Sequence, residues 1–441
     1  MLDLSILLTA AFLASVPTPA RAQESNCRTG TYKLTDGSDV DIGPADSAHL
    51  RWRRMDGTTG ELTRTADGWW ASTLGWTGRP DGKRVGFDCD RKTIDFSGQA
   101  GKRIAFDMVE TRFEGAGVQL AGRLVMPKGN GTVPIVVLVH GSEHSSARDF
   151  FALQRLFPAA GIGAFVYDKR GTGASGGRYT QDYLMLADDA IDAMREAKRL
   201  AGKRVGRIGY QGGSQGGWVA PLAARIEPVD FVIVGFGLAV SPLEEDREAI
   251  ALDMTRHGYG ADVVAKAMEI ADATAAVLLS DFREGYDKVD AVKKKYGGEP
   301  WFKYVRGNVS FVILEKSAAE LREVGPTLLP GIPLQYDPMP VLRNLEAPQL
   351  WILGADDIDA PSAETARRLK VLAAAGRTIT TAVFPHAEHG IYEYETAPDG
   401  TRLSTRQPAG YFRMMRDFVL NGRIGVSYGT ARISKPAVRT Q

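Results

Sequence analysis

Residues 207–217, with the sequence RIGYQGGSQGG, decide the fold class of this chain. A short apolar run ends in the pattern Gly-x-Ser-x-Gly, and a helical run follows over 218–225. A strand, a tight turn and a helix in this order are typical of a turn that exposes a serine hydroxyl at the carboxyl edge of a sheet. Glycines two positions before and two after Ser214 let the strand and the helix approach closely. The alternative is a glycine turn with a purely structural role.

Unbroken apolar runs on both sides of this turn indicate strands that are buried on both faces of a mostly parallel sheet. The runs cover 133–139, 163–167, 207–211, 231–235 and 349–354. They alternate with helical segments such as 183–200, whose apolar residues recur on one side. This alternation predicts an α/β fold with helices on both faces of the sheet.

Two segments depart from the alternation. Residues 242–340 carry helical signals without a clear core strand, which predicts an inserted helical cap with helices over 246–257, 262–279, 287–296 and 311–323. Residues 23–102 contain short strand-like runs separated by four Asp-Gly turns, which predicts a small antiparallel β module. The α/β domain is therefore expected over 103–425, followed by a flexible tail over 426–441.

The amino terminus predicts export. An apolar run over 4–16 precedes Ala20-Arg21-Ala22, a pattern typical of a secretory signal peptide over 1–22, and the run is too short to span a membrane. No Lys or Arg precedes the run, so an uncleaved anchor or an incorrect start is the alternative. We expect a secreted or periplasmic protein, in which Cys27 and Cys89 can pair as a disulfide; two unpaired thiols are the alternative.

Composition narrows the function class. Lys and Arg number 54 against 53 Asp and Glu, and this net charge of +1 argues against a nucleic-acid binder. Two cysteines exclude a multi-cysteine metal site. Four of the seven tryptophans lie in the β module: Trp52, Trp69, Trp70 and Trp76. They could form a ligand or glycan platform, but we prefer the interpretation that a small β domain needs large side chains to build its core.

A serine hydroxyl is a poor nucleophile without a neighbouring base. Among the six histidines, His389 is the candidate base, because residues 381–390 predict a strand that runs into a loop ending in His-Gly. His386, in the same loop, is the alternative.

The imidazole needs a carboxylate that fixes its tautomer and stabilises its charged form. The loop after 349–354 offers Asp356, Asp357 and Asp359, and the spacing Gly-x-x-Asp-x-x-x-Pro favours Asp357. The order Ser214, Asp357, His389 agrees with that of folds built on this serine turn.

Over roughly 103–425 the chain resembles the α/β-hydrolase superfamily, and within it the secreted or periplasmic serine esterase/peptidase-like hydrolases of bacteria. The matching segments are 138–142, 148–149, 167–173, 212–217, 336–338, 350–354 and 389–390. The resemblance implies an oxyanion hole from the backbone N–H groups of Gln215 and Ser142. Members of the family often have Gly-Pro after the position of Ser142, whereas this chain has Glu143-His144.

The expected function is hydrolysis of an acyl bond through Ser214, His389 and Asp357, with a small ester or a short peptide as substrate and an ester preferred. The alternative is an aminopeptidase or prolyl-type peptidase, in which Glu143, Glu244 or Glu245 would hold the substrate amine. A glycan- or wall-binding protein on a hydrolase scaffold is an alternative of another class. We expect no cofactor and no metal. Residues 171–176 match Gly-x-Gly-x-x-Gly, the dinucleotide-binding pattern, but they do not directly open a helix, which dinucleotide binding requires.

Overall fold

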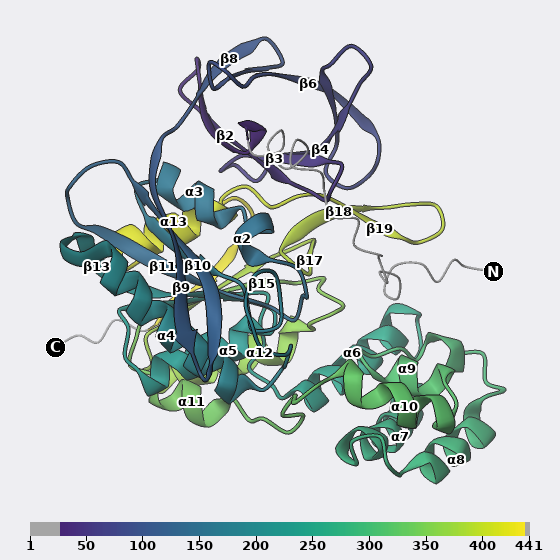
Figure 1. Ribbon diagram of the computed structural model, residues 1–441. Coiled ribbons are helices and arrows are strands. Elements are labelled where there is room, and N and C mark those ends of the chain that lie inside the picture. Colours follow the sequence, from purple (N-terminus) through teal and green to yellow (C-terminus); the bar gives the residue numbers. More distant parts are fainter. Residues whose placement is uncertain (1–26, 437–441) are drawn as a thin grey trace.

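The structure is a computed structural model that describes residues 27–436. The predicted signal peptide over 1–22 lies outside these residues. Figure 1 shows three parts: a barrel at the top, a sheet layered with helices below it, and a group of helices at the lower right. None of the helices within 27–436 is long and apolar enough to cross a membrane.

A nine-stranded mixed sheet forms the centre, in the order β20-β16-β15-β14-β13-β11-β12-β10-β9. The strands from β16 to β12 run parallel to one another, and antiparallel strands complete both edges. Their bounds are β9 Phe106–Gly115, β10 Val118–Pro127, β11 Val133–Val139, β12 Gly163–Tyr167, β13 Val205–Gly213, β14 Phe231–Gly235, β15 Gln349–Gly354, β16 Ile379–Phe384 and β20 Arg432–Ser434. Each predicted buried strand is present, and β13 extends the predicted run 207–211 at both ends.

Helices cover both faces of this sheet. Alternate residues of β11 divide between two cores: Val137 belongs to the core that includes side chains of α4 (Tyr183–Ala201), α5 (Gly216–Ile226) and α12 (Ser362–Ala374), whereas Leu138 belongs to the core that includes side chains of α3 (Leu153–Ala159) and α13 (Tyr411–Asn421). Burial on both faces explains why these strands are uniformly apolar.

The amino-terminal part corrects the prediction of a small β module. Its eight strands form a closed antiparallel barrel, because β1 pairs with β8 as well as with β2. The strands are β1 Gly30–Leu34, β2 Asp39–Pro44, β3 Leu50–Arg53, β4 Thr59–Arg64, β5 Trp70–Thr73, β6 Pro80–Asp88, β7 Thr93–Phe96 and β8 Gln99–Arg103. Hairpin signals specify neighbouring strands, but closure depends on a pairing between the two ends of the segment, which no local pattern encodes.

Large side chains fill the barrel. Trp52 and Trp70 are buried in its core, and Trp52 donates a hydrogen bond to Ser72. Trp52 and Trp70 therefore serve the core rather than an exposed platform.

A disulfide joins Cys27 to Cys89 across 62 residues of sequence.

Helices α6 to α10 form the inserted group at the lower right of Figure 1. They span α6 Pro242–Arg256, α7 Ala261–Leu279, α8 Tyr286–Tyr296, α9 Ser310–Glu315 and α10 Ala318–Leu328. The single helix predicted over 311–323 is two helices, because Ser317 and Glu320 form a capping box that begins a new one.

The segment predicted as a flexible tail is partly ordered. Its strand β20 pairs antiparallel with the edge strand β16, and Tyr428 is buried with its hydroxyl hydrogen-bonded to Asp417. The unpaired backbone groups of an edge strand favour such an addition.

A small sheet of β17 (Ala387–Glu388), β18 (Tyr392–Thr396) and β19 (Arg402–Arg406) connects the central sheet to the barrel. The backbone N–H of Trp76 donates to the Ser404 carbonyl at 2.8 Å, and the Trp76 ring packs edge-on against Tyr392. The barrel thus packs on the segment that carries His389.

Candidate active site

Ser214 occupies the sharp turn between β13 and α5. Its φ of 52° lies in the left-handed region, where a residue with a side chain is strained. A side chain at Gly212 would collide with the Gly216 carbonyl, and a Cβ at Gly216 would lie 2.9 Å from the His140 carbonyl oxygen. The glycines around Ser214 are therefore required by close backbone approach.

One imidazole lies between this serine and a carboxylate. His389 Nε2 is 3.2 Å from Ser214 Oγ, and His389 Nδ1 is 3.0 Å from Asp357 Oδ2. The three side chains come from the turn after β13, the loop after β15 and the loop after β17, which are far apart in sequence. The fold brings together the three residues that the sequence analysis selected.

Asp357 is fixed from both sides. It is buried, with 2% of its surface exposed, and its Oδ1 accepts hydrogen bonds from the N–H groups of Asp359 and Ala360 at 3.0 and 2.8 Å. With Oδ1 occupied, Oδ2 is left to accept from His389 Nδ1. Neutral His389 then carries its proton on Nδ1, and Nε2 can accept the serine proton.

The alternative candidates, His386, Asp356 and Asp359, take no part in the hydrogen bonds that join Ser214, His389 and the carboxyl group of Asp357. The His386 side chain is 88% exposed and lies beside Asp356, which also accepts a hydrogen bond from the Tyr394 hydroxyl. Asp359 is exposed, yet its charge acts on His389. Neither His386 nor Asp356 contacts Ser214 in the hydrogen bonds of residues 27–436.

The charges around His389 make it a stronger base. Burial alone would lower its pKa, but the hydrogen bond and charge of Asp357, together with the charges of Asp359 and Glu245, raise the pKa to about 9. Phe236 packs edge-on against the imidazole with ring centroids 5.0 Å apart. Sequence analysis missed Phe236, because one aromatic residue at the end of an apolar strand carries no distinguishing signal.

Two backbone donors lie beside the turn. No hydrogen bond within residues 27–436 uses the N–H groups of Ser142 and Gln215. A Cβ at Gly141 would lie 3.4 Å from the Gly213 carbonyl oxygen, so the 140–142 turn packs directly against the serine turn. Both free donors are therefore near the serine.

The turn over 140–142 is held by residues that sequence analysis did not single out for this role. Lys169 is buried, and its Nζ donates to the Gly141 carbonyl at 2.7 Å. The Tyr179 hydroxyl donates to the Ser142 carbonyl at 2.6 Å. Lys169 sits in a charged Asp-Lys-Arg run, which resembles a solvated loop in sequence.

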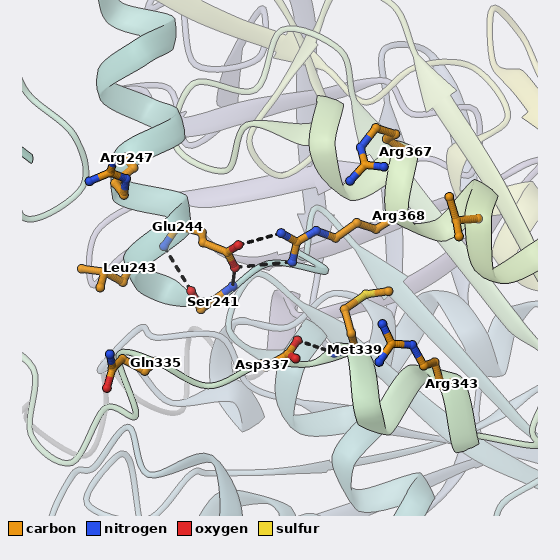
Figure 2. A pocket seen from close by; sticks show the side chains of 11 residues that line it. Ser241, Leu243, Glu244, Arg247, Gln335, Asp337, Met339, Arg343, Arg367 and Arg368 are labelled. Atoms are coloured by element: carbon orange, nitrogen blue, oxygen red, sulfur yellow. Dashed lines mark hydrogen bonds and ion pairs between the residues drawn. The ribbon is translucent and has the colours of Figure 1, made fainter. Parts of the chain in front are cut away.

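The acidic residues considered for amine binding have different surroundings. Glu244 is occupied, since it accepts hydrogen bonds from Arg368 and from the Ser241 N–H (Figure 2). Glu143 Oε1 lies 3.4 Å from the Gly141 nitrogen. The carboxyl group of Glu245 makes no hydrogen bond or ion pair within 27–436, and burial raises its pKa well above the usual range.

Two cavities lie where the cap meets the core. The cavity in Figure 2 has a volume of 540 Å³ and is lined from α6, α11 (Met339–Asn344) and α12, with none of the three central side chains in its wall. A second cavity of 680 Å³ lies between α6 and α12 and reaches Asp357. The cap therefore lies beside the carboxylate end of the site.

One group of side chains has the spacing of a cation site. Single ligand atoms of Asp357, Asp359 and His389 lie within 4.8 Å of one another. The hydrogen bond between Asp357 and His389 Nδ1 already uses two of these groups, so this arrangement is accounted for by orientation of the imidazole.

No family model matches the chain, and no curated protein matches its sequence. Among solved structures, an esterase of Pyrococcus furiosus is similar at 14% identity and a TM-score of 0.40, covering 64% of this chain and 83% of that one. An acylaminoacyl peptidase of Pyrococcus horikoshii is similar at 14% identity and a TM-score of 0.44, and the match covers 90% of this chain and 57% of that one. A proline iminopeptidase of Mycobacterium smegmatis is similar at 17% identity and a TM-score of 0.39, and the match covers 64% of this chain and 91% of that one.

Proposed function

We propose that this chain is a serine hydrolase of the α/β-hydrolase superfamily that cleaves acyl bonds, with Ser214, His389 and Asp357 as catalytic residues. The observation that carries the proposal is one imidazole hydrogen-bonded through its two ring nitrogens to a serine hydroxyl and a buried carboxylate. That arrangement makes an otherwise weak nucleophile reactive, because the proton has an acceptor at the moment of attack.

Ser214 Oγ attacks the substrate carbonyl carbon while its proton passes to His389 Nε2. Asp357 stabilises the resulting imidazolium through Nδ1. When the tetrahedral intermediate collapses, the leaving group takes the proton from Nε2 and departs, and an acyl group remains on Ser214. Water then attacks this ester with His389 again as the base, which releases the carboxylic acid and restores the serine hydroxyl.

The negative oxygen of the tetrahedral intermediate needs donors that are already in place. The Ser142 and Gln215 N–H groups meet this need, because both are free and both lie beside the serine turn. Such donors commonly contribute about 10²- to 10³-fold to kcat each.

The direct test is Ser214→Ala. With its nucleophile removed, kcat should fall by about 10⁶-fold where chemistry limits the rate, and labelling by a fluorophosphonate should disappear. Ser47→Ala, at an exposed turn of the barrel, is the matched control and should retain full activity. Near-normal turnover by the Ser214→Ala protein with unchanged thermal unfolding would refute the proposal.

An ester is the preferred substrate. In the part of the chain that the structure describes, no ion pair or hydrogen bond marks a binding site for a peptide amine, and the chemistry of Ser214, His389 and Asp357 suits either bond. A panel of nitrophenyl esters and aminoacyl anilides of matched acyl size decides between the two bonds, with faster ester hydrolysis expected.

A second candidate, an aminopeptidase, is favoured by one observation. Glu245 on α6 lies close enough to His389 to act on it electrostatically, and its carboxyl group makes no hydrogen bond or ion pair within 27–436, as expected of an acidic group that would pair with a substrate amine. Glu245→Gln should lower kcat/KM for aminoacyl anilides at least tenfold more than for uncharged esters. Equal effects on both substrates would remove this candidate.

We further propose a secreted or periplasmic location. The Cys27–Cys89 disulfide supports it, because disulfides persist in oxidising compartments. Fractionation of cells that express the full chain, with amino-terminal sequencing of the product, tests both export and cleavage after Ala22.

A further inference from the structure

Lys169 is a buried cation without a paired carboxylate. Its exposed fraction is 2%, and no ion pair joins it to any residue of 27–436; Glu143 affects it only through its charge. Burial lowers the pKa of Lys169 to about 8. Removing the Lys169 charge from water costs free energy, so the buried charge needs a compensating interaction. The contacts of the Lys169 ammonium group identify one.

The ammonium group of Lys169 contacts the 140–142 turn. Its Nζ donates to the Gly141 carbonyl at 2.7 Å and lies 4.4 Å from the centre of the Tyr179 ring. The Tyr179 ring in turn stacks on His144, with centroids 3.7 Å apart. Lys169 and Tyr179 therefore hold two consecutive peptide groups of this turn.

The orientation of the Ser142 N–H follows from that contact. A trans peptide is planar, and its carbonyl and its N–H point in opposite directions. The Gly141 carbonyl and the Ser142 N–H belong to the same peptide group. When Lys169 fixes this carbonyl, the N–H is fixed on the opposite side, where it makes no hydrogen bond within 27–436.

Lys169 is itself held rigidly. The neighbouring Asp168 is fully buried and accepts hydrogen bonds from the Ser146 hydroxyl and from the N–H groups of Arg148 and Ala174. The Lys169 carbonyl also accepts from the Thr172 side chain at 2.7 Å. The glycine-rich loop after Lys169 thus supports a fixed ammonium position.

We propose that Lys169 is a positioning residue that, through the Gly141 carbonyl, holds the Ser142 N–H ready to receive the negative oxygen of the tetrahedral intermediate. This inference rests on the proposed function. It assigns the buried lysine an effect on the transition state and none on substrate binding.

The test compares Lys169→Met, which keeps most of the unbranched side chain without the donor, with Lys169→Arg, which keeps a cationic donor. For Lys169→Met, kcat should fall about 10- to 100-fold with KM changed less than about threefold, and the Ki of a boronic acid that mimics the tetrahedral intermediate should rise in parallel. Lys169→Arg should recover part of kcat. Lys203→Met, on the exposed surface, should match the wild type.

Crystal structures of the wild type and Lys169→Met give a readout that is independent of activity. The Gly141–Ser142 peptide should rotate in the variant. An unrotated peptide, a wild-type kcat, or a loss of kcat that follows only the loss of thermal stability overturns the role of Lys169. If the wild type shows no Ser214-dependent hydrolysis, the proposed function fails instead, and the peptide orientation still decides what Lys169 does.

Discussion

At the residue scale, His389 has the most informative environment. Three carboxylates act on its charge: Asp357 by direct hydrogen bond, and Asp359 and Glu245 through their charges. In the proposed reaction they would stabilise the imidazolium that forms, but the same charges favour the protonated form of His389 before the reaction begins. Stabilisation of the transition state and availability of the base therefore oppose one another.

A pH dependence follows. A general base must be neutral, so the rate should rise with pH until His389 has lost its proton. Because the pKa is raised to about 9, kcat/KM should still be increasing above pH 7. Asp359→Asn removes one of the charges that raise this pKa and should move the rising limb to lower pH.

The measurement is the pH profile of kcat/KM for an uncharged ester. Asp262→Asn, at an exposed position on α7, is the control and should leave the profile in place. A wild-type midpoint near 6.5, or an identical profile for Asp359→Asn, would contradict the assigned electrostatics.

At the element scale, the serine turn depends on how closely β13 and α5 approach. Gly212 has an ordinary backbone conformation, so its requirement for glycine comes only from the space beside it. A methyl group there would meet the Gly216 carbonyl and the Ala220 side chain. The helix would have to move away from the strand that carries Ser214.

Gly212→Ala should therefore destabilise the protein by about 1–3 kcal/mol and lower kcat, because overpacking shifts the backbone. Urea unfolding and ester hydrolysis measure the two effects. Gly131→Ala is the matched control, since a Cβ at Gly131 meets nothing within 4 Å. Equal stability of the two variants would show that the space between β13 and α5 accommodates a methyl group at position 212.

The helices and strands also show how far local sequence is informative. The strands over 133–139, 163–167, 231–235 and 349–354 are present with the predicted bounds, because burial on both faces leaves an uninterrupted apolar run. The break between α9 and α10 was missed, because the helical period of apolar residues continues across Ser317 while its capping box begins a new helix.

At the scale of the whole molecule, the barrel is joined to the core by a buried ion pair. Arg155 on α3 donates to both carboxylate oxygens of Asp41 on β2, at 2.7 and 3.1 Å. Thr31 on β1 also donates to the Arg155 carbonyl. Together with the contact between Trp76 and Tyr392, this interface links the barrel to the segment that carries His389.

Asp41→Asn should cost about 3–5 kcal/mol in the free energy of unfolding, because it leaves the buried Arg155 charge without compensation. Replacing both partners, as Asp41→Leu with Arg155→Met, should recover most of that loss. Asp67→Asn breaks the exposed pair with Arg84 and should cost no more than about 1 kcal/mol. Urea unfolding checks all three, and a loss of similar size at positions 41 and 67 would contradict the role given to burial.

The sequence alone determined the alternation of buried strands and helices, the serine turn, and the selection of His389 and Asp357 from spacing and chain order. These features are encoded locally, by periodicity, glycine placement and short motifs. Only the tertiary structure decided that the eight amino-terminal strands close into a barrel, that β20 completes an edge of the sheet, and that Lys169 and Glu245 lie beside the site. Such features depend on contacts between residues far apart in the chain, whose closeness is set by the packing of whole elements and leaves no local pattern.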